Sequence, residues 1–201
     1  MRQIFKWLLI LPFTLSLQAQ SAPAAAPKTE ETAIFAGGCF WCLESAYEGL
    51  KGVKAVISGY TGGKTKDPTY KEVGRGNTGH TEAIKLVFDP SQVTYERLLE
   101  LYWQESDPTD DGGQFVDRGS QYRPEIFYTT PEQKVTAEAS KAALQKSGRF
   151  KKPLITPITS AGPFYEAEIH HQDYYKKNPD AYKNYKDNSG RKEYLKDNWK
   201  K

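Results

Sequence analysis

The sequence predicts an α+β fold of two layers, in which helices flank a mixed β-sheet. Stretches that alternate with period two and stretches with apolar residues every three or four positions occur in mixed order, without an internal repeat. Their connections are both short and long, unlike the regular winding of a parallel α/β sheet. With 201 residues, of which 38% are hydrophobic and 13% aromatic, the chain is long enough for one globular domain and too aromatic to be disordered.

A strand, a glycine turn and a helix open the predicted domain. The apolar stretch at residues 33–36 stops at Gly37–Gly38, after which apolar residues recur at helical spacing, namely Leu43, Ala46, Tyr47 and Leu50. Residues 53–60 alternate as a second strand and end in a polar, glycine-rich loop. The first predicted unit is therefore strand, helix, strand.

The later elements are bounded by turn and cap residues. In the second long helix, Thr130 suits the N-cap, Pro131 the first turn and Gln133 the position three residues after the cap. The elements expected in this part of the chain are a strand at 82–89, a helix from Thr94, a glycine-rich loop at 106–123, a strand at 125–128, a helix from Thr130 to Gly148 and a strand at 154–159.

Residues 1–19 have the pattern of a secretory signal peptide. Arg2 and Lys6 precede an apolar stretch that contains Pro12 and is shorter than the roughly 20 residues of a bilayer span, and Ala19 suits cleavage. An uncleaved anchor is the alternative. Residues 20–31 then read as a Pro/Ala-rich linker. We expect the protein to be exported, to a periplasm or to the medium.

The charge balance predicts no nucleic-acid partner. Without residues 1–19 the formal net charge falls from +3 to +1, because two basic residues and no acidic residue are lost. Residues 176–201 carry nine Lys or Arg against four acidic residues, so a basic, tyrosine-rich tail follows a slightly acidic domain. We expect the tail to be solvated and partly helical, with docking to a membrane surface or a partner as the alternative.

Cys39 and Cys42 are the only cysteines of the chain. Cys39 follows two glycines and precedes a predicted helix, where free backbone N–H groups and the helix dipole stabilise an anion. This placement is expected to lower the pKa of Cys39 towards neutrality and to make its thiolate a nucleophile. Cys42 follows one helical turn later, close enough for a disulfide after a small local adjustment. The pair is predicted to do redox chemistry.

The residues alone leave other roles for the pair open. A structural disulfide would close so short a loop that it would stabilise the fold little. A zinc site could be completed by His80, His170 or His171, although no second ligand pair has metal-like spacing. The substrate of a redox pair could be another disulfide or a different group.

Five motifs give the chain a specific resemblance to a known family. They are GGCFW at 37–41, GYTGG at 59–63, PTY at 68–70, GHTEA at 79–83 and GSQYR at 119–123. In this order they resemble the methionine sulfoxide reductase A family, the peptide-methionine (S)-S-oxide reductases. The resemblance covers residues 32–175 and implies a catalytic domain there, with a ferredoxin-like core and long loops.

The resemblance implies a role for each of eight residues. Cys39 would attack the sulfoxide sulfur, and Cys42 would resolve the sulfenic acid formed on it. Glu82 would protonate the departing oxygen, which requires burial that keeps its carboxyl neutral near pH 7. The other implied residues are Tyr70 and Tyr122 as phenols on the sulfoxide oxygen, Phe40 and Trp41 as a pocket for the S-methyl group, and Asp117 as an orienting carboxylate. His80, His170 and His171 are expected to be structural.

The implied cycle uses no bound cofactor or metal and takes its electrons from an external dithiol of thioredoxin type. Its substrates would be free methionine-S-sulfoxide and oxidised proteins and peptides that carry it. Many family members have Gly where Cys42 stands and resolving cysteines in the tail, which here has none, so recycling is expected to use Cys42. An exported enzyme would need a delivered reductant. We expect a monomer without a stable membrane span.

Two other functions fit part of the pattern. A thiol-disulfide oxidoreductase of thioredoxin type would use the same cysteine pair but gives no reason for Glu82. A secreted peptide-binding module would use the Gly/Tyr-rich loops and keep the cysteines as structural residues. If the chain is a sulfoxide reductase, Cys39→Ser should abolish sulfoxide reduction.

Overall fold

The computed structural model describes residues 30–199. The predicted signal peptide at 1–19 and nearly all of the predicted linker at 20–31 lie outside the described residues and stay predictions. Within the described range, none of the helices combines the length and apolar character that a bilayer span needs.

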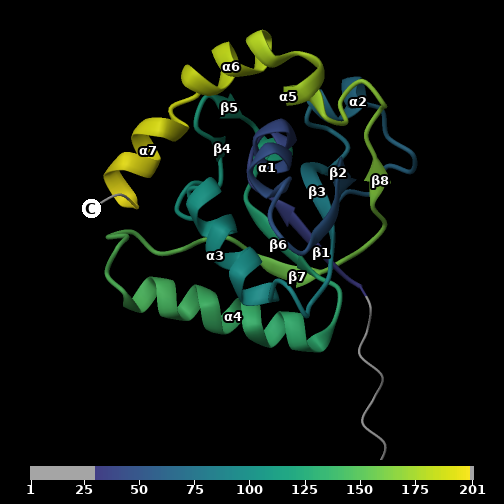
Figure 1. Cartoon of the computed structure of the whole chain (residues 1–201). Helices are drawn as coiled ribbons and strands as arrows, with labels where there is room; N and C mark the ends of the chain where they lie inside the picture. The colour runs from purple at the N-terminus through teal and green to yellow at the C-terminus, as the bar shows by residue number, and fades with distance from the viewer. Residues whose placement is uncertain (1–29, 200–201) are drawn as a thin grey trace, which may run out of the picture.

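A six-stranded sheet with the order β7-β6-β1-β3-β2-β8 organises the fold (Figure 1). All neighbouring strands are antiparallel except β6 and β7, which are parallel, so the predicted α+β fold with a mixed sheet is confirmed. The strands are β1 (Glu31–Ala36), β2 (Val53–Thr61), β3 (Thr81–Phe88), β6 (Glu125–Tyr128), β7 (Ile158–Ser160) and β8 (Tyr165–Glu166). A separate hairpin pairs β4 (Gly113–Gln114) with β5 (Asp117–Arg118).

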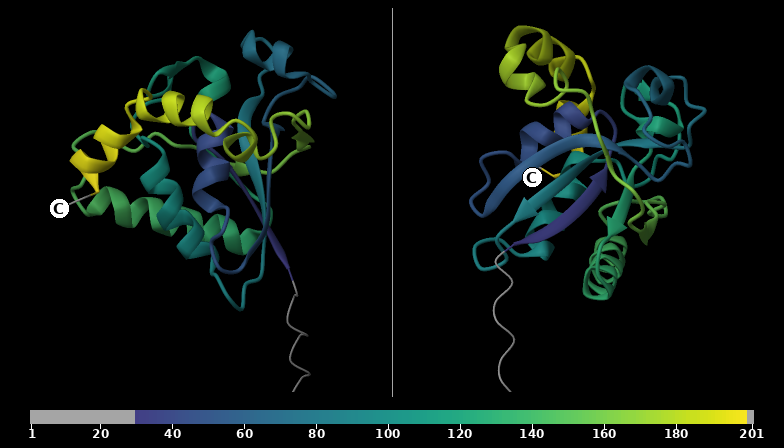
Figure 2. Two further views of the ribbon diagram at one scale, coloured as in Figure 1. Left: turned by 45° about the horizontal axis from the view of Figure 1, so that its top comes forward. Right: turned by 90° about the vertical axis from the view of Figure 1, so that its right-hand side faces the viewer.

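The middle of the sheet has the predicted ferredoxin-like order. Helix α1 (Phe40–Tyr47) connects β1 to β2, and α3 (Tyr95–Glu105) connects β3 to β6 over the same sheet. These two helices and α4 (Pro131–Lys146) lie together on one side of the sheet (Figure 2). The opposite side is covered by Ala161 and Phe164 from the segment between β7 and β8. The molecule therefore has two main layers.

The predicted helix starts are confirmed by their caps. The Thr94 hydroxyl accepts a hydrogen bond from the Arg97 N–H, and the Thr130 hydroxyl accepts one from the Gln133 N–H. These contacts lie within three residues of each cap, so the local sequence suffices to predict them.

The strand predicted at 154–159 is wrong in its first half. Strand β7 begins only at Ile158. Leu154 is buried in the core, and its N–H donates to the side chain of Gln145 at 2.7 Å, so it does not extend the ladder with β6. Two short elements have no counterpart among the predicted ones: the two-residue β8 and the one-turn helix α2 (Tyr70–Gly74), which has a capping box of Thr69 and Glu72.

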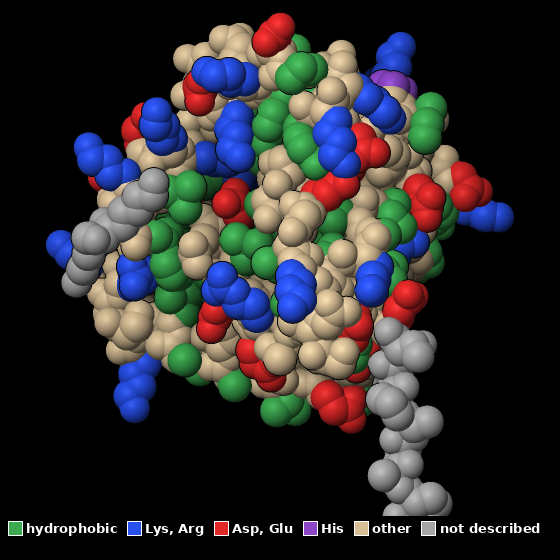
Figure 3. All heavy atoms as spheres, viewed as in Figure 1, with side chains coloured by type: hydrophobic (Ala, Val, Ile, Leu, Met, Phe, Trp, Pro, Cys, Tyr) green, Lys and Arg blue, Asp and Glu red, His purple; other side chains and the backbone are tan. Residues whose placement is uncertain are grey.

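The C-terminal tail is helical as predicted, and it is solvated on one face while a few of its side chains are buried. Helices α5 (Tyr174–Lys177), α6 (Pro179–Asp187) and α7 (Arg191–Asn198) continue the fold past residue 175. Tyr182 and Arg191 are buried among them. Figure 3 shows Lys and Arg side chains, mixed with acidic ones, along the top and left where α6 and α7 lie. The tail is amphipathic, so its lysines meet solvent while its tyrosines and Arg191 face the protein.

Candidate active site

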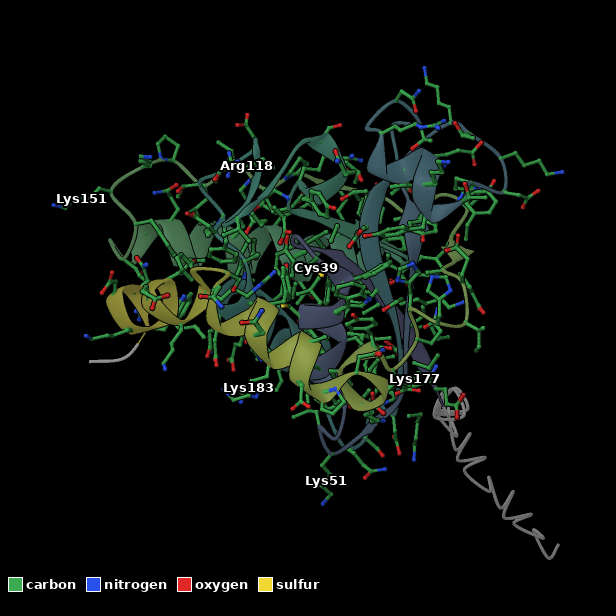
Figure 4. All side chains as sticks on the ribbon, turned by 90° about the horizontal axis from the view of Figure 1, so that it is seen from above. Cys39, Lys51, Arg118, Lys151, Lys177 and Lys183 are labelled. Carbon is green, nitrogen blue, oxygen red and sulfur yellow. The ribbon has the colours of Figure 1, made fainter. Side chains whose placement is uncertain are left out.

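The Gly37–Gly38 turn places Cys39 directly before α1, as predicted. Gly38 has φ +84°, and a Cβ on it would lie 2.7 Å from the Cβ of Gln114, so the turn requires glycine. Cys39 is the N-cap residue of α1 and is 6% exposed, whereas Cys42 in the first turn is completely buried. Figure 4 shows Cys39 near the middle of the molecule, where α1 begins.

The prediction that Cys39 has a lowered pKa is wrong. Burial, the Cys42 thiol and the charge of Glu82 raise the pKa of Cys39. The hydrogen bond from Cys39 and the charge of Arg191 lower the pKa of Cys42 to about 7. The start of α1 does not reverse this order, because the N–H of Phe40 donates to Oε2 of Glu82 at 3.0 Å. Of the two thiols, Cys39 therefore holds its proton more tightly than Cys42 does.

Glu82 meets the requirement that the sequence analysis set for a proton donor. It lies at the start of β3, and its side chain is 2% exposed. Burial raises the pKa of Glu82 to about 8, although the hydrogen bond from the Phe40 N–H acts in the opposite direction. The carboxyl group is therefore largely neutral near pH 7.

Two phenols and a second carboxyl group surround Glu82. Tyr70 begins α2, and Tyr122 ends the 3₁₀ turn η1 (Ser120–Tyr122); the two phenols lie near enough for Tyr122 to act on the pKa of Tyr70. Burial and the charge of Glu82 raise the pKa of both tyrosines, that of Tyr70 to about 12, so both keep a proton to donate. Burial also raises the pKa of Asp117 in β5, whose charge acts on Glu82. The fold thus brings these predicted residues together from four elements.

The predicted aromatic residues lie beside this group in different surroundings. Phe40 is completely buried, with its ring stacked near that of Tyr70 at 6.3 Å. Trp41 is half-buried, and its indole stacks on Tyr174 of α5 with 3.7 Å between ring centres. One side of the aromatic group is therefore formed by Tyr174, at the C-terminal end of the domain predicted at residues 32–175.

Several residues of the C-terminal segment belong to the site although the sequence analysis did not predict them. The hydroxyl of Tyr185 in α6 donates to Asp117 and also interacts with the Cys39 thiol. His171 lies 4.2 Å from the Tyr70 ring, and neither of its buried nitrogens has a hydrogen-bond partner among residues 30–199. The available signal was the density of His and Tyr at 170–185.

The remaining histidine and acidic residues have structural contacts. His80 accepts from the Gly63 N–H at 3.1 Å and meets the Thr65 carbonyl at 2.7 Å, so it fixes the loop after β2. In the described part of the chain, the one group of three side chains spaced for a metal ion is Glu44, Glu48 and Asp173. Lys176 already forms ion pairs with Glu48 and Asp173, so a lysine occupies this acidic group.

Known proteins match the chain along almost the whole described range. The model of a family described as peptide methionine sulfoxide reductase matches residues 31–201, past the limit of 175 that the motifs indicated. The peptide methionine sulfoxide reductase MsrA of Listeria monocytogenes serotype 4b is 58% identical over 170 residues, which are 85% of this chain and 96% of the relative. The MsrA of Bacillus subtilis strain 168 is 54% identical with the same coverage.

Solved structures show the same architecture. Methionine sulfoxide reductase A of Corynebacterium diphtheriae superposes with a TM-score of 0.67 at 34% identity, covering 77% of each chain. Mxr1 from Saccharomyces cerevisiae in its reduced form superposes with a TM-score of 0.72 at 28% identity, covering 77% of this chain and 89% of the other. The mixed sheet and its flanking helices are thus common to this chain and these proteins.

Proposed function

Because the chain belongs to the peptide methionine sulfoxide reductase family and is an enzyme of that kind, we propose that it reduces the S epimer of methionine sulfoxide, both free and in proteins. The observation that carries this proposal is Glu82, a buried and largely neutral carboxyl group bound to the N–H of the residue after Cys39. Sulfoxide reduction needs this acid, because oxygen leaves sulfur only when protonated. The alternatives, a thioredoxin-type oxidoreductase and a peptide-binding module, give it no role.

The first step joins Cys39 to the sulfoxide. The Cys42 thiolate, one helical turn from Cys39, accepts the proton that the attacking sulfur gives up. The Cys39 sulfur then attacks the sulfoxide sulfur, while Glu82 protonates the oxygen and the phenols of Tyr70 and Tyr122 hold it. The S–O bond of the substrate breaks and the oxygen ends on Cys39. Methionine leaves reduced by two electrons, and Cys39 becomes a sulfenic acid.

The second step uses the other cysteine. Cys42 attacks the sulfur of the Cys39 sulfenic acid, the S–O bond breaks, and a disulfide and water form. Its position in the first turn of α1 and the absence of cysteine from residues 176–201 support this assignment, which makes the chain a member of the GCFWC type. An external dithiol of thioredoxin type would then reduce the disulfide, so no bound cofactor takes part.

The proposed function also includes export of the enzyme from the cytoplasm. The signal-peptide pattern at 1–19 supports a periplasmic or secreted enzyme that repairs methionine in exported proteins. The N-terminal sequence of the mature protein from fractionated cells tests this. A chain that begins at about residue 20 outside the cytoplasm supports export, and a full-length cytoplasmic chain contradicts it.

An assay with separated sulfoxide epimers and dithiothreitol tests the reaction. We expect turnover of the S form, little of the R form, and no activity in Cys39→Ser because the attacking sulfur is gone. Tyr128→Phe, at a half-exposed position in β6, is the matched control and should retain full activity. Equal turnover of both epimers, or an active Cys39→Ser protein, would disprove the proposal.

The role of Cys42 has its own test. With a thioredoxin donor, Cys42→Ser should release about one methionine per enzyme and then stop, because the sulfenic acid on Cys39 has no internal thiol to resolve it. Quenched-flow measurement of released methionine gives this number. Sustained wild-type turnover in Cys42→Ser would remove Cys42 from the cycle.

A further inference from the structure

Arg191 is a buried cation held against the turn that carries Cys39. Its side chain is 2% exposed, and its Nη2 donates to the Gly37 carbonyl at 2.9 Å. Its Nη1 donates to the Glu105 carbonyl, and the guanidinium lies over the Phe115 ring at 4.6 Å. These contacts fix the charge between α3, the hairpin and the glycine turn.

The anions near Arg191 leave part of its charge without a partner. Burying a guanidinium is costly unless an anion or several acceptors compensate it. The Glu105 carboxylate lies 3.8 Å from Nη1, at the outer limit of an ion pair. The Nε of Arg191 is buried and donates to no atom of the described chain. Of the acidic groups acting on Arg191, Cys42 has the largest effect, ahead of Glu105.

We propose that Arg191 is a positioning residue for the second half of the cycle, because its charge keeps the Cys42 sulfur as the thiolate that attacks the Cys39 sulfenic acid. This inference rests on the proposed role of Cys42 as the resolving thiol. Cys42 first loses the proton that it received from Cys39, and Glu82 regains the proton that it gave to the sulfoxide oxygen. The Cys42 thiolate then forms the S–S bond with Cys39, the S–O bond breaks, and the hydroxyl leaves as water with the proton from Glu82.

The same charge assists reduction of the disulfide. Cys39 is 6% exposed and Cys42 is completely buried, so an incoming dithiol reaches the sulfur of Cys39 first. Its thiolate then bonds to Cys39, the S–S bond breaks, and the electron pair returns to Cys42. A thiol of lower pKa leaves faster, so the guanidinium accelerates this step as well.

The groups around Cys42 include one with the opposite effect. Arg191 and Lys186 lower the pKa of Cys42, whereas Glu105 raises it. The other ionisable side chains that act on Cys42 are Cys39 in the turn, and Tyr182 on α6 beside Lys186. Glu105 lies on α3 and Arg191 on α7. The charges of Glu82 on β3 and Tyr185 on α6 also interact with the charge of Cys42. Removal of Arg191 must therefore raise the pKa of Cys42, whereas removal of the Glu105 charge must lower it.

The test follows the ionisation of Cys42 and the rate of disulfide formation in substituted full-length enzyme. In a Cys39→Ser background, the thiolate absorbance against pH reports Cys42 alone. We expect Arg191→Met to raise the pKa of Cys42 by about one unit and to slow disulfide formation at neutral pH about tenfold. Release of methionine in the first turnover should slow less than disulfide formation does. Arg191→Lys keeps the positive charge and should restore most of the rate of disulfide formation. Glu105→Gln should lower the pKa of Cys42.

The control is Lys192→Gln, which removes a charge from the exposed neighbour on α7 and should change neither quantity. An unchanged Cys42 pKa in folded Arg191→Met overturns the inference. If Arg191→Met does not fold, Glu105→Gln decides alone, and a Cys42 pKa that does not fall overturns it. Full turnover by Cys42→Ser would instead defeat the proposed function, because the resolving role itself would be lost.

Discussion

Glu82 combines two opposing influences in one carboxyl group. Its burial favours the neutral form, whereas the N–H of Phe40 favours the ionised form, and burial has the larger effect. The result is an acid that is protonated at neutral pH and still oriented by a fixed hydrogen bond. A donor for a sulfoxide oxygen needs both properties.

This balance predicts the pH dependence of the rate. Because the pKa of Glu82 is raised to about 8, the acid is protonated below that pH and is lost as the pH rises through it. Single-turnover release of methionine should therefore fall above about pH 8 in the wild type. Glu82→Gln keeps a donor and should be slower but lose this alkaline limb, whereas Glu82→Ala should be slower by a further factor of about ten or more. Equal rates in all three proteins would refute the assignment.

The individual site residues were predictable to the extent that their signal is local. Cys39 and Glu82 stand in short motifs, and burial of Glu82 follows from its place in an apolar strand. The pKa order of the thiols was not predictable, because the carboxyl that occupies the start of α1 comes from β3, 42 positions away. Tyr185 and Arg191 could not be assigned for the same reason, since no local pattern shows that the tail returns to the turn.

The Gly37–Gly38 turn shows how one element positions the nucleophile. Gly38 has a positive φ, and the space where its Cβ would be is filled by Gln114. Gly49, after the end of α1, also has a positive φ but has no atom within 4 Å of its Cβ position. A substitution at Gly49 therefore tests backbone strain alone, whereas a substitution at Gly38 tests strain and crowding together.

We expect Gly49→Ala to reduce the free energy of unfolding by about 1 kcal/mol, the cost of a side chain in the left-handed region. Gly38→Ala should cost about 1–3 kcal/mol more, because Gln114 must also move, and it should reduce the activity by displacing Cys39. Urea denaturation and initial rates measure both effects. Equal stability and activity of the two variants would contradict this account of the turn.

Elements with a cap or a long period were predictable, and short ones were not. The caps Thr94 and Thr130 lie next to the helices they begin. Strand β8 has only two residues and exists through its pairing with β2, so no periodicity marks it. Leu154 fits the pattern of a strand because it is apolar, but its burial comes from packing on the core beneath α4.

Stability of the whole molecule should decrease as the pH rises from acidic to weakly basic. The pKa of Glu82 is about 8 in the folded protein against an ordinary value of 4.5, so its contribution is complete below about pH 4.5 and lost by about pH 8. The full change is on the order of 5 kcal/mol. Burial raises the pKa of Glu44 to about 7, which acts in the same direction.

Urea unfolding at about pH 5 and about pH 8 checks this expectation. The wild type should lose several kcal/mol of unfolding free energy over this interval, and Glu82→Gln should lose clearly less. Glu138→Gln, at an exposed position on α4, is the control and should behave like the wild type. The same pH dependence in Glu82→Gln and in the wild type would contradict the burial of a neutral acid.

The bond from Arg191 to the Gly37 carbonyl joins residues that are 154 positions apart. During synthesis the ribosome therefore delivers the whole sheet and both cysteines before the residue that closes the site from behind. A nascent chain that stops before α7 lacks the donor to the Gly37 carbonyl, and so does a chain from which a protease has removed α7. Completion of the chain thus acts as the last step in assembling its reactive site.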